Sequence, residues 1–110
     1  MLTVSLFLGV YLAGTRVEKG DAVMQAQFDL MKLSYACSDP LYRTKRDSVR
    51  RFVRRFDTDT TFKDEDVSDL DSGLRNGTVR LGKSINKGDC ITLLTEAQGK
   101  VDLLFEEFSR

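Results

Sequence analysis

Histidine and tryptophan are absent from this chain of 110 residues, which also has only one proline and two cysteines. Without histidine there is no imidazole base, no catalytic triad that depends on one and no histidine-bearing zinc site. Two cysteines cannot complete a four-thiolate zinc site, and these two lie too far apart for a CxxC redox pair. We therefore expect a protein that is not an enzyme and that holds no metal or other cofactor.

The chain also lacks an excess of charge of either sign, with 17 basic and 17 acidic residues. Residues 43–55 hold seven basic side chains and one acid, whereas residues 57–71 hold seven acids and one base. A protein that binds nucleic acid needs uncompensated positive surface, because phosphate contacts supply most of the affinity. The sequence therefore predicts no nucleic-acid partner. Either the two segments compensate each other on a solvated face, or the charges meet a protein partner.

The start of the chain, residues 2–14, is uncharged and mostly apolar. The run is shorter than the roughly 20 residues that a spanning helix needs, and its length suits a secretory signal, although no Lys or Arg precedes it. Its alternating apolar residues would also suit a half-buried strand. Leu12-Ala13-Gly14 resembles the tripeptide before the lipidated cysteine of bacterial lipoproteins, but Thr15 offers no thiol. We expect residues 1–20 to form an apolar leader, signal-like or an anchor, and residues 21–110 to form the domain.

The segment from Asp21 to Cys37 has the apolar periodicity of a helix with a wide buried face. One stripe contains Met24, Phe28, Met31 and Tyr35, and a second stripe beside it contains Val23, Ala26, Leu30, Leu33 and Cys37. A face of this width predicts packing against more than one neighbour. Pro40 predicts the end of the helix, because proline disfavours helical geometry in the residue before it.

A second helix is predicted from Thr44, which has capping-box spacing to Asp47. Its apolar stripe consists of Val49, Phe52, Val53 and Phe56. The arginines that surround this stripe (Arg50, Arg51, Arg54 and Arg55) fall outside it, so we expect them on the wet side of an amphipathic helix.

Two further helices complete an all-α, four-helix domain. The third runs from Thr61 to about Arg75, with acids in the first turn where the helix dipole favours them and a stop signal at residues 76–77. The last begins after Asp89, which we expect to cap it, and runs to the end of the chain. Its apolar face contains Cys90, Leu94, Ala97, Val101, Leu104 and Phe108, with Ile91 and Phe105 at the flanks. Gly99 weakens this helix by about 1 kcal/mol relative to alanine, which suggests a close neighbour there.

Cys37 closes the first predicted helix and Cys90 opens the last. A disulfide between them would pin the two longest helices together, and for a loop of this size it would stabilise the fold by about 4 kcal/mol. Export to an oxidising compartment favours the bond. The alternative is a pair of buried free thiols.

Five segments in this order are similar to the type II secretion pilotins of the PulS/OutS kind. They are LMKLSYAC, DSVRRFVRRF, FDTDTTF, DEDVSDLDSGL and KGDCITLLTEAQGKVDLL, and the resemblance covers about residues 22–108. It implies a small periplasmic four-helix protein with one disulfide. Such proteins bind the C-terminal segment of an outer-membrane secretin as a helix in a groove, and they assist its targeting and assembly as chaperones.

The chain departs from the pilotin pattern at two positions. Family members are usually lipoproteins of the outer membrane, whereas Thr15 stands where their lipidated cysteine would be. Phe56 stands where a tryptophan usually precedes Asp-Thr. The first departure affects membrane association, and the second affects only packing.

The resemblance and the apolar stripes together predict a groove that accepts a partner helix. We expect its walls to be Met24, Leu30 and Met31 on the first helix and Val49, Phe52 and Phe56 on the second. Arg51 and Arg55 would lie on its rim and meet acidic residues of the partner. The alternative function is a periplasmic immunity or inhibitor protein that binds an effector enzyme through a charged surface.

Overall fold

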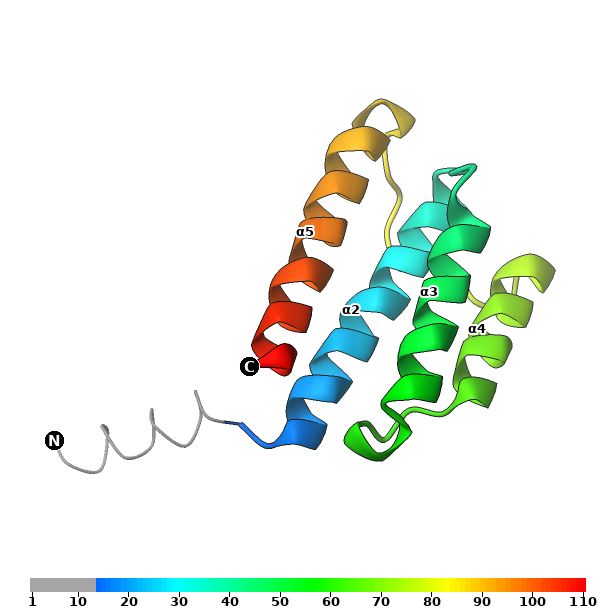
Figure 1. Cartoon of the computed structure of the whole chain (residues 1–110). Helices are drawn as coiled ribbons and strands as arrows, with labels where there is room; N and C mark the ends of the chain where they lie inside the picture. The colour runs from blue at the N-terminus through cyan, green and yellow to red at the C-terminus, as the bar shows by residue number, and fades with distance from the viewer. Residues whose placement is uncertain (1–13) are drawn as a thin grey trace, which may run out of the picture.

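The computed structural model describes residues 14–110, and this part of the chain is an all-α domain (Figure 1). The α-helices are α2 (Arg16–Ala36), α3 (Tyr42–Arg55), α4 (Asp64–Asn76) and α5 (Cys90–Ser109), with short 3-10 turns η1 (Asp57–Asp59) and η2 (Lys87–Asp89). In Figure 1 the helices lie side by side in the order α5, α2, α3, α4, so that α2 is flanked on both sides. The predicted four-helix fold is confirmed. Among the described helices, none combines the length and the apolar character that crossing a membrane requires.

Helix α2 begins at Arg16, earlier than the predicted start at Asp21. The Oγ of Thr15 accepts a hydrogen bond from the Glu18 amide at 3.0 Å, and the Glu18 carboxylate accepts one from the Thr15 amide at 3.2 Å. This reciprocal pair is a capping box, and it explains the early start. The boundary predicted between residues 20 and 21 therefore falls inside α2, and the predicted leader lies, up to residue 13, outside the described residues. Thr15, which follows the lipoprotein-like tripeptide Leu12-Ala13-Gly14, acts as a helix cap.

The start of α3 differs from its prediction, because Asp39 and not Thr44 organises it. Asp39 accepts a hydrogen bond from the Leu41 amide at 2.9 Å, another from the Ser34 hydroxyl at 2.9 Å, and a third from the ammonium of Lys45. The chain is thus already turned at Leu41, and the helix begins at Tyr42. The capping box predicted at Thr44 was wrong, since that residue lies within the first turn of α3.

Helix α4, in contrast, begins later than predicted, at Asp64 instead of Thr61. The Asp66 carboxylate accepts a hydrogen bond from the Lys63 amide at 2.7 Å, which fixes the first turn. The predicted stop is confirmed, because Gly77 adopts the left-handed conformation with φ of 78° that ends helices. Asp89 stands at the N-cap position of α5 as predicted, although its side chain makes no capping hydrogen bond.

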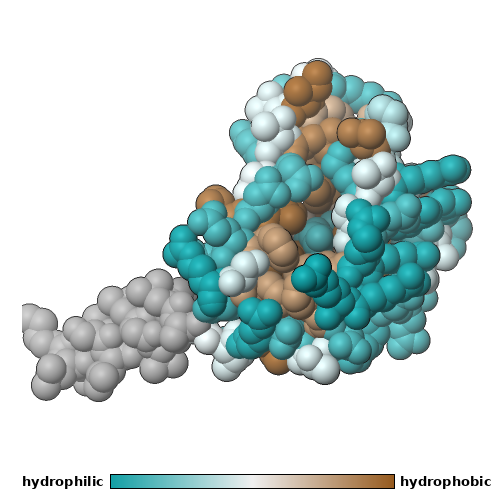
Figure 2. Space-filling model, viewed as in Figure 1, coloured by the Kyte–Doolittle hydropathy of each residue, from teal (hydrophilic) through white to brown (hydrophobic). Residues whose placement is uncertain are grey.

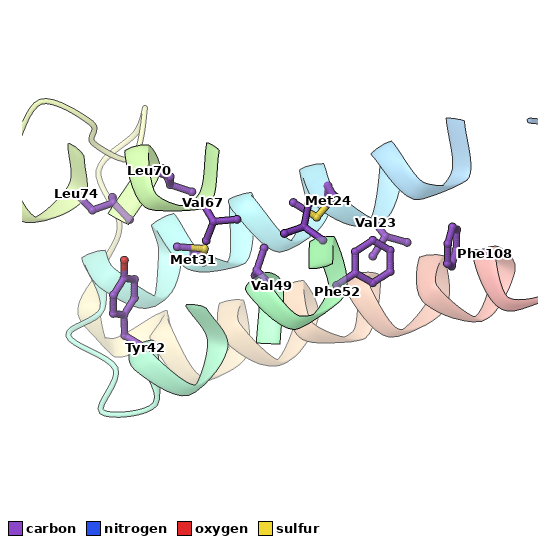
Figure 3. Packing of buried hydrophobic residues seen from close by; sticks show 11 residues of the cluster. Val23, Met24, Met31, Tyr42, Val49, Phe52, Val67, Leu70, Leu74 and Phe108 are labelled. Atoms are coloured by element: carbon purple, nitrogen blue, oxygen red, sulfur yellow. The ribbon is translucent and has the colours of Figure 1, made fainter. Parts of the chain in front are cut away.

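The core divides the wide apolar face of α2 between two sets of neighbours, of which Figure 3 shows the larger. The larger cluster joins α2, α3, α4 and the end of α5, and its buried members are Val23, Met24, Met31, Tyr42, Val49, Phe52, Val53, Val67, Leu70, Leu74 and Phe108. The smaller cluster joins α2 to α5 through Ala26, Leu30 and Val101. The prediction that the first helix packs against more than one neighbour is confirmed.

Helix α5 is fastened to α2 at both ends. At one end a disulfide joins Cys37 and Cys90, whose Cα atoms are 5.9 Å apart, as predicted. At the other end the Arg16 guanidinium donates a hydrogen bond to the Phe108 carbonyl oxygen and lies 3.8 Å from the centroid of the Phe108 ring. Arg16 also forms an ion pair with Asp59 at 3.4 Å. These contacts fix the position of α5 on α2.

Asp21 ties α2 to the corner that follows η1. Its carboxylate accepts hydrogen bonds from the Thr60 hydroxyl at 2.5 Å, the Thr61 amide at 2.7 Å and the Thr61 hydroxyl at 2.7 Å. Burial by itself would raise the pKa of this carboxyl, but the three hydrogen bonds to the charged form outweigh burial and hold the pKa below its usual range. A carboxyl with a lowered folded-state pKa stabilises the fold above its unfolded-state pKa, and this stability is lost as the pH falls through the folded-state pKa.

We expect Asp21→Asn to lower the free energy of unfolding at neutral pH by roughly 1–2 kcal/mol, because an amide offers one acceptor oxygen in place of two charged ones. The variant should also lose less stability than the wild type between about pH 5 and pH 2, the range in which the Asp21 carboxylate becomes protonated. Denaturant unfolding at a series of pH values measures both effects. Asp29→Asn is the control, since Asp29 is exposed and accepts a hydrogen bond only from Gln25. Equal pH profiles for Asp21→Asn and the wild type would contradict the assignment.

Candidate functional site

A groove lies between α3 and α5, because both helices pack on α2 while their backbones stay apart. One part is a hollow of about 210 Å³ lined by Gln27, Leu30, Leu41, Thr44, Lys45, Ser48, Val49, Gln98 and Val101. The next part is a hollow of about 410 Å³ lined by Gln27, Ser48, Arg51, Phe52, Arg55, Phe56, Gln98, Val101, Asp102 and Phe105. Since the two hollows share four residues, they form one continuous depression, which we call the α3–α5 groove.

The floor and one end of the α3–α5 groove are apolar. Leu30, Val49 and Val101 are buried beneath its surface. At its wider part, Phe105 of α5 reaches across to Phe52 of α3, with ring centroids 5.9 Å apart, and remains 42% exposed. Figure 2 shows hydrophobic residues in a hollow near the middle of this face of the molecule, with hydrophilic residues around them. An apolar floor inside a polar rim is typical of a surface that binds another chain.

The arginines of α3 divide into two sets that face different neighbours. On the side toward α4, Arg46 forms an ion pair with Asp71 at 3.5 Å, and Arg54 forms one with Asp64 at 3.1 Å. This set supports the interpretation that the basic and acidic segments compensate each other within the molecule.

The second set, Arg51 and Arg55, lines the α3–α5 groove and is exposed. Arg51 donates a hydrogen bond to the Ser48 hydroxyl at 3.0 Å, and the Arg55 guanidinium lies 5.4 Å from the centroid of the Phe56 ring. Neither arginine forms an ion pair with any residue between 14 and 110. Their charge is therefore available to a ligand in the groove.

The opposite wall carries different polar groups. Asp102 of α5 lines the α3–α5 groove and accepts a hydrogen bond from the Gln98 amide at 3.0 Å. Between the walls, Gln27 of α2 lines both hollows, and its Oε1 atom is buried without a hydrogen-bond partner in the described chain. A buried carbonyl oxygen without a partner is costly, and a ligand that donates a hydrogen bond would satisfy it once the amide turns toward the groove.

Six of the predicted groove residues line the α3–α5 groove: Leu30, Val49, Arg51, Phe52, Arg55 and Phe56. Met24 and Met31 do not, because their stripe of α2 faces α3 and α4 and both side chains are fully buried in the core (Figure 3). Their predicted role as groove walls does not fit this geometry.

Sequence reasoning did not assign Gln27 of α2, Leu41 of the α2–α3 turn, or the residues that α5 contributes, namely Gln98, Val101, Asp102 and Phe105. Part of the signal was present, since Val101 and Phe105 belong to the predicted apolar face of the last helix and to its flank. The sequence did not show that this helix would stand opposite α3.

The groups in the α3–α5 groove can bind a ligand. Within residues 14–110, no cluster of three or more acidic, cysteine or histidine side chains is arranged to hold a metal ion. Both cysteines are joined in the disulfide. The groove offers apolar surface, free guanidinium groups, amide groups, the Lys45 ammonium and the Asp102 carboxylate, and these are groups of a binding surface.

Comparison with known protein families, with curated proteins and with solved structures gave no match to this chain. The assignment to the pilotins stays a prediction, based on the sequence segments given above.

Proposed function

We propose that this protein binds an amphipathic helix of a partner protein in the α3–α5 groove. The observation that carries this proposal is the groove itself, which has an apolar floor, an exposed Phe105 and two unpaired arginines on its rim. In the helix-in-groove mode, an amphipathic helix lays its apolar face into such a depression. Its affinity comes from apolar burial, at ~25 cal/mol per Å² before the costs of ordering the ligand are subtracted.

The ligand's shape follows from the arrangement of α3 and α5. Both helices flank α2 (Figure 1), and the two hollows of the α3–α5 groove lie between them. A helix with its side chains is about 10 Å across, so a ligand helix in the α3–α5 groove would contact α3 on one side, α5 on the other and α2 beneath it. An extended strand would find no sheet edge to pair with among the described residues, which form helices and turns.

We further propose that the partner is the C-terminal segment of an outer-membrane secretin, and that the protein acts as a periplasmic chaperone or pilotin in type II secretion. The support is the resemblance of residues 22–108 to the pilotins, together with the groove. A disulfide between α2 and α5 suits the oxidising periplasm. Association with the outer membrane would come from the secretin or from the chain before Arg16, since Thr15 cannot carry a lipid thioether.

The alternative, an immunity or inhibitor protein that acts through a charged surface, has less support. Its acidic surface would lie on α4, where Asp64 and Asp71 are already paired with arginines of α3. Fewer carboxylates then remain free to meet a basic enzyme. This alternative would gain weight if secretin peptides failed to bind.

Phe105→Asp tests the proposal in a secretin-binding experiment. We expect the full chain to bind the C-terminal peptide of a secretin from the same organism, and we expect Phe105→Asp to weaken binding at least tenfold, because it places a carboxylate on the apolar wall. Leu103→Asp is the matched control, since Leu103 is an exposed apolar residue of the same helix that does not line the groove. Fluorescence anisotropy gives both affinities, and circular dichroism verifies the fold of each variant.

The proposal fails if the peptide leaves the NMR spectrum of the oxidised protein unshifted at high micromolar concentration. It also fails if Leu103→Asp and Phe105→Asp weaken binding equally, because the ligand would then lie outside the groove.

A further inference from the structure

The charges around the α3–α5 groove are asymmetric, with cations on the α3 wall and one carboxylate on the α5 wall. From this asymmetry we infer that the ligand helix carries two carboxylates four residues apart on the flank of its apolar stripe that faces α3. This inference rests on the proposed function and adds the chemistry by which the groove selects its partner.

The spacing of the free arginines sets the spacing of the ligand's acids. Arg51 and Arg55 are four residues apart on α3, so they project from the same side of the helix with about 6 Å between them along its axis. Carboxylates at positions i and i+4 of a ligand helix that runs along α3 have the same separation. Each carboxylate would then face one guanidinium, which has no other ion-pair partner among residues 14–110.

The α5 wall favours the opposite charge on the other flank. Asp102 is the acidic residue that lines the groove, and the amide of Gln98 provides its hydrogen bond. A ligand that carried its acids on this flank would place them beside Asp102, where like charges repel. The two walls therefore fix the rotation of the ligand helix about its own axis as well as its composition.

The floor adds a hydrogen-bond requirement between two apolar contacts. Leu30 and Leu41 line the smaller hollow, and Phe52 and Phe105 line the larger one, with Gln27 at the junction of the two. Since the Gln27 Oε1 atom is buried and has no partner in the described structure, a donor on the ligand between its two apolar anchors would satisfy it once the amide turns toward the groove. The ligand is thus an amphipathic helix with two apolar anchors, a polar residue between them and an acidic flank toward α3.

The test uses three designed helical peptides of about five turns, each with leucines at i, i+4, i+7 and i+11. They differ only at two flank positions four residues apart, which are Glu in one peptide, Gln in the second and Lys in the third. We expect the wild-type protein to bind the Glu peptide about tenfold more tightly than the Lys peptide, with the Gln peptide between them. The preference should shrink as salt is added.

A charge-reversed protein makes the test specific to the two arginines. The double variant Arg51→Glu, Arg55→Glu should prefer the Lys peptide. The control Arg43→Glu, Lys83→Glu changes the net charge equally at exposed positions that do not line the groove, and it should keep the preference for Glu. Equal affinity for all three peptides would overturn the inference and leave helix binding in place. If no peptide bound at high micromolar concentration and the secretin peptide also failed, the proposed function itself would fall.

Discussion

Replacing both Cys37 and Cys90 with alanine should lower the free energy of unfolding by about 4 kcal/mol. The two cysteines are separated by 53 positions in the chain, so the bond restricts a large loop of the unfolded chain. In the chain-entropy model, a loop of this length gives a stabilisation of this size. A domain of this length has a total stability of about 5–15 kcal/mol, so the loss would be a large part of it.

The helices should still form in the double variant, because α5 keeps its other contacts with α2. Arg16 holds the opposite end of α5, and Leu30 and Val101 pack between the two helices. Denaturant unfolding with and without a reducing agent provides the measurement. The wild type should lose about the same stability on reduction, whereas the double variant should be insensitive to the reductant. A wild type whose unfolding midpoint is unaffected by complete reduction would contradict this prediction.

The existence and the faces of the helices could be predicted because they depend on periodicity along the chain. Val49, Phe52 and Val53 recur at helical spacing, and all three are buried as expected. The end of α4 could also be predicted from the sequence, since Gly77 adopts a left-handed conformation that few other residues adopt without strain. These signals are local, and the rest of the fold does not need to be known to interpret them.

The exact helix starts could not be predicted, because several side chains compete for the same free amides. Thr44 and Asp47 have the spacing of a capping box, but Asp39 lies nearer to the turn and binds the Leu41 amide first. Thr61 appeared to start α4, but it is a hydrogen-bond donor to Asp21 across the fold. A partner 40 residues away cannot be found from local patterns.

The candidate site was predictable in part for the same reason. Arg51 and Arg55 necessarily lie outside the apolar stripe of α3, so their exposure followed from periodicity. Arg46 and Arg54 differ from these two because they pair with acids of α4. That difference depends on where α4 packs in the tertiary structure, which periodicity along the chain does not show. Met24 was assigned to the groove because periodicity gives the width of an apolar face but not the neighbour that covers each part of it.

Two of the glycines that lie within helices, Gly20 and Gly99, show the same limit and lead to a paired prediction. Gly99 was expected to have a close neighbour, but a Cβ atom added there would meet nothing within 4 Å. Gly20, which the sequence placed in the leader, is buried, and a Cβ atom there would lie 1.9 Å from the carbonyl oxygen of Asp59. Of these two glycines, Gly20 is the one where the fold has no room for a side chain, because α2 packs closely against η1 there.

We expect Gly20→Ala to lower the free energy of unfolding by about 2–3 kcal/mol, because the added methyl group must displace backbone at η1 and crowd the Phe108 ring 3.3 Å away. Gly99→Ala makes the same chemical change in an open part of α5 and should raise the free energy of unfolding by up to about 1 kcal/mol through helix propensity. Thermal and denaturant unfolding of the two variants should therefore move in opposite directions from the wild type. If Gly20→Ala were as stable as the wild type, α2 and η1 could not approach as closely as the structure shows. A destabilised Gly99→Ala would restore the close neighbour that the sequence suggested.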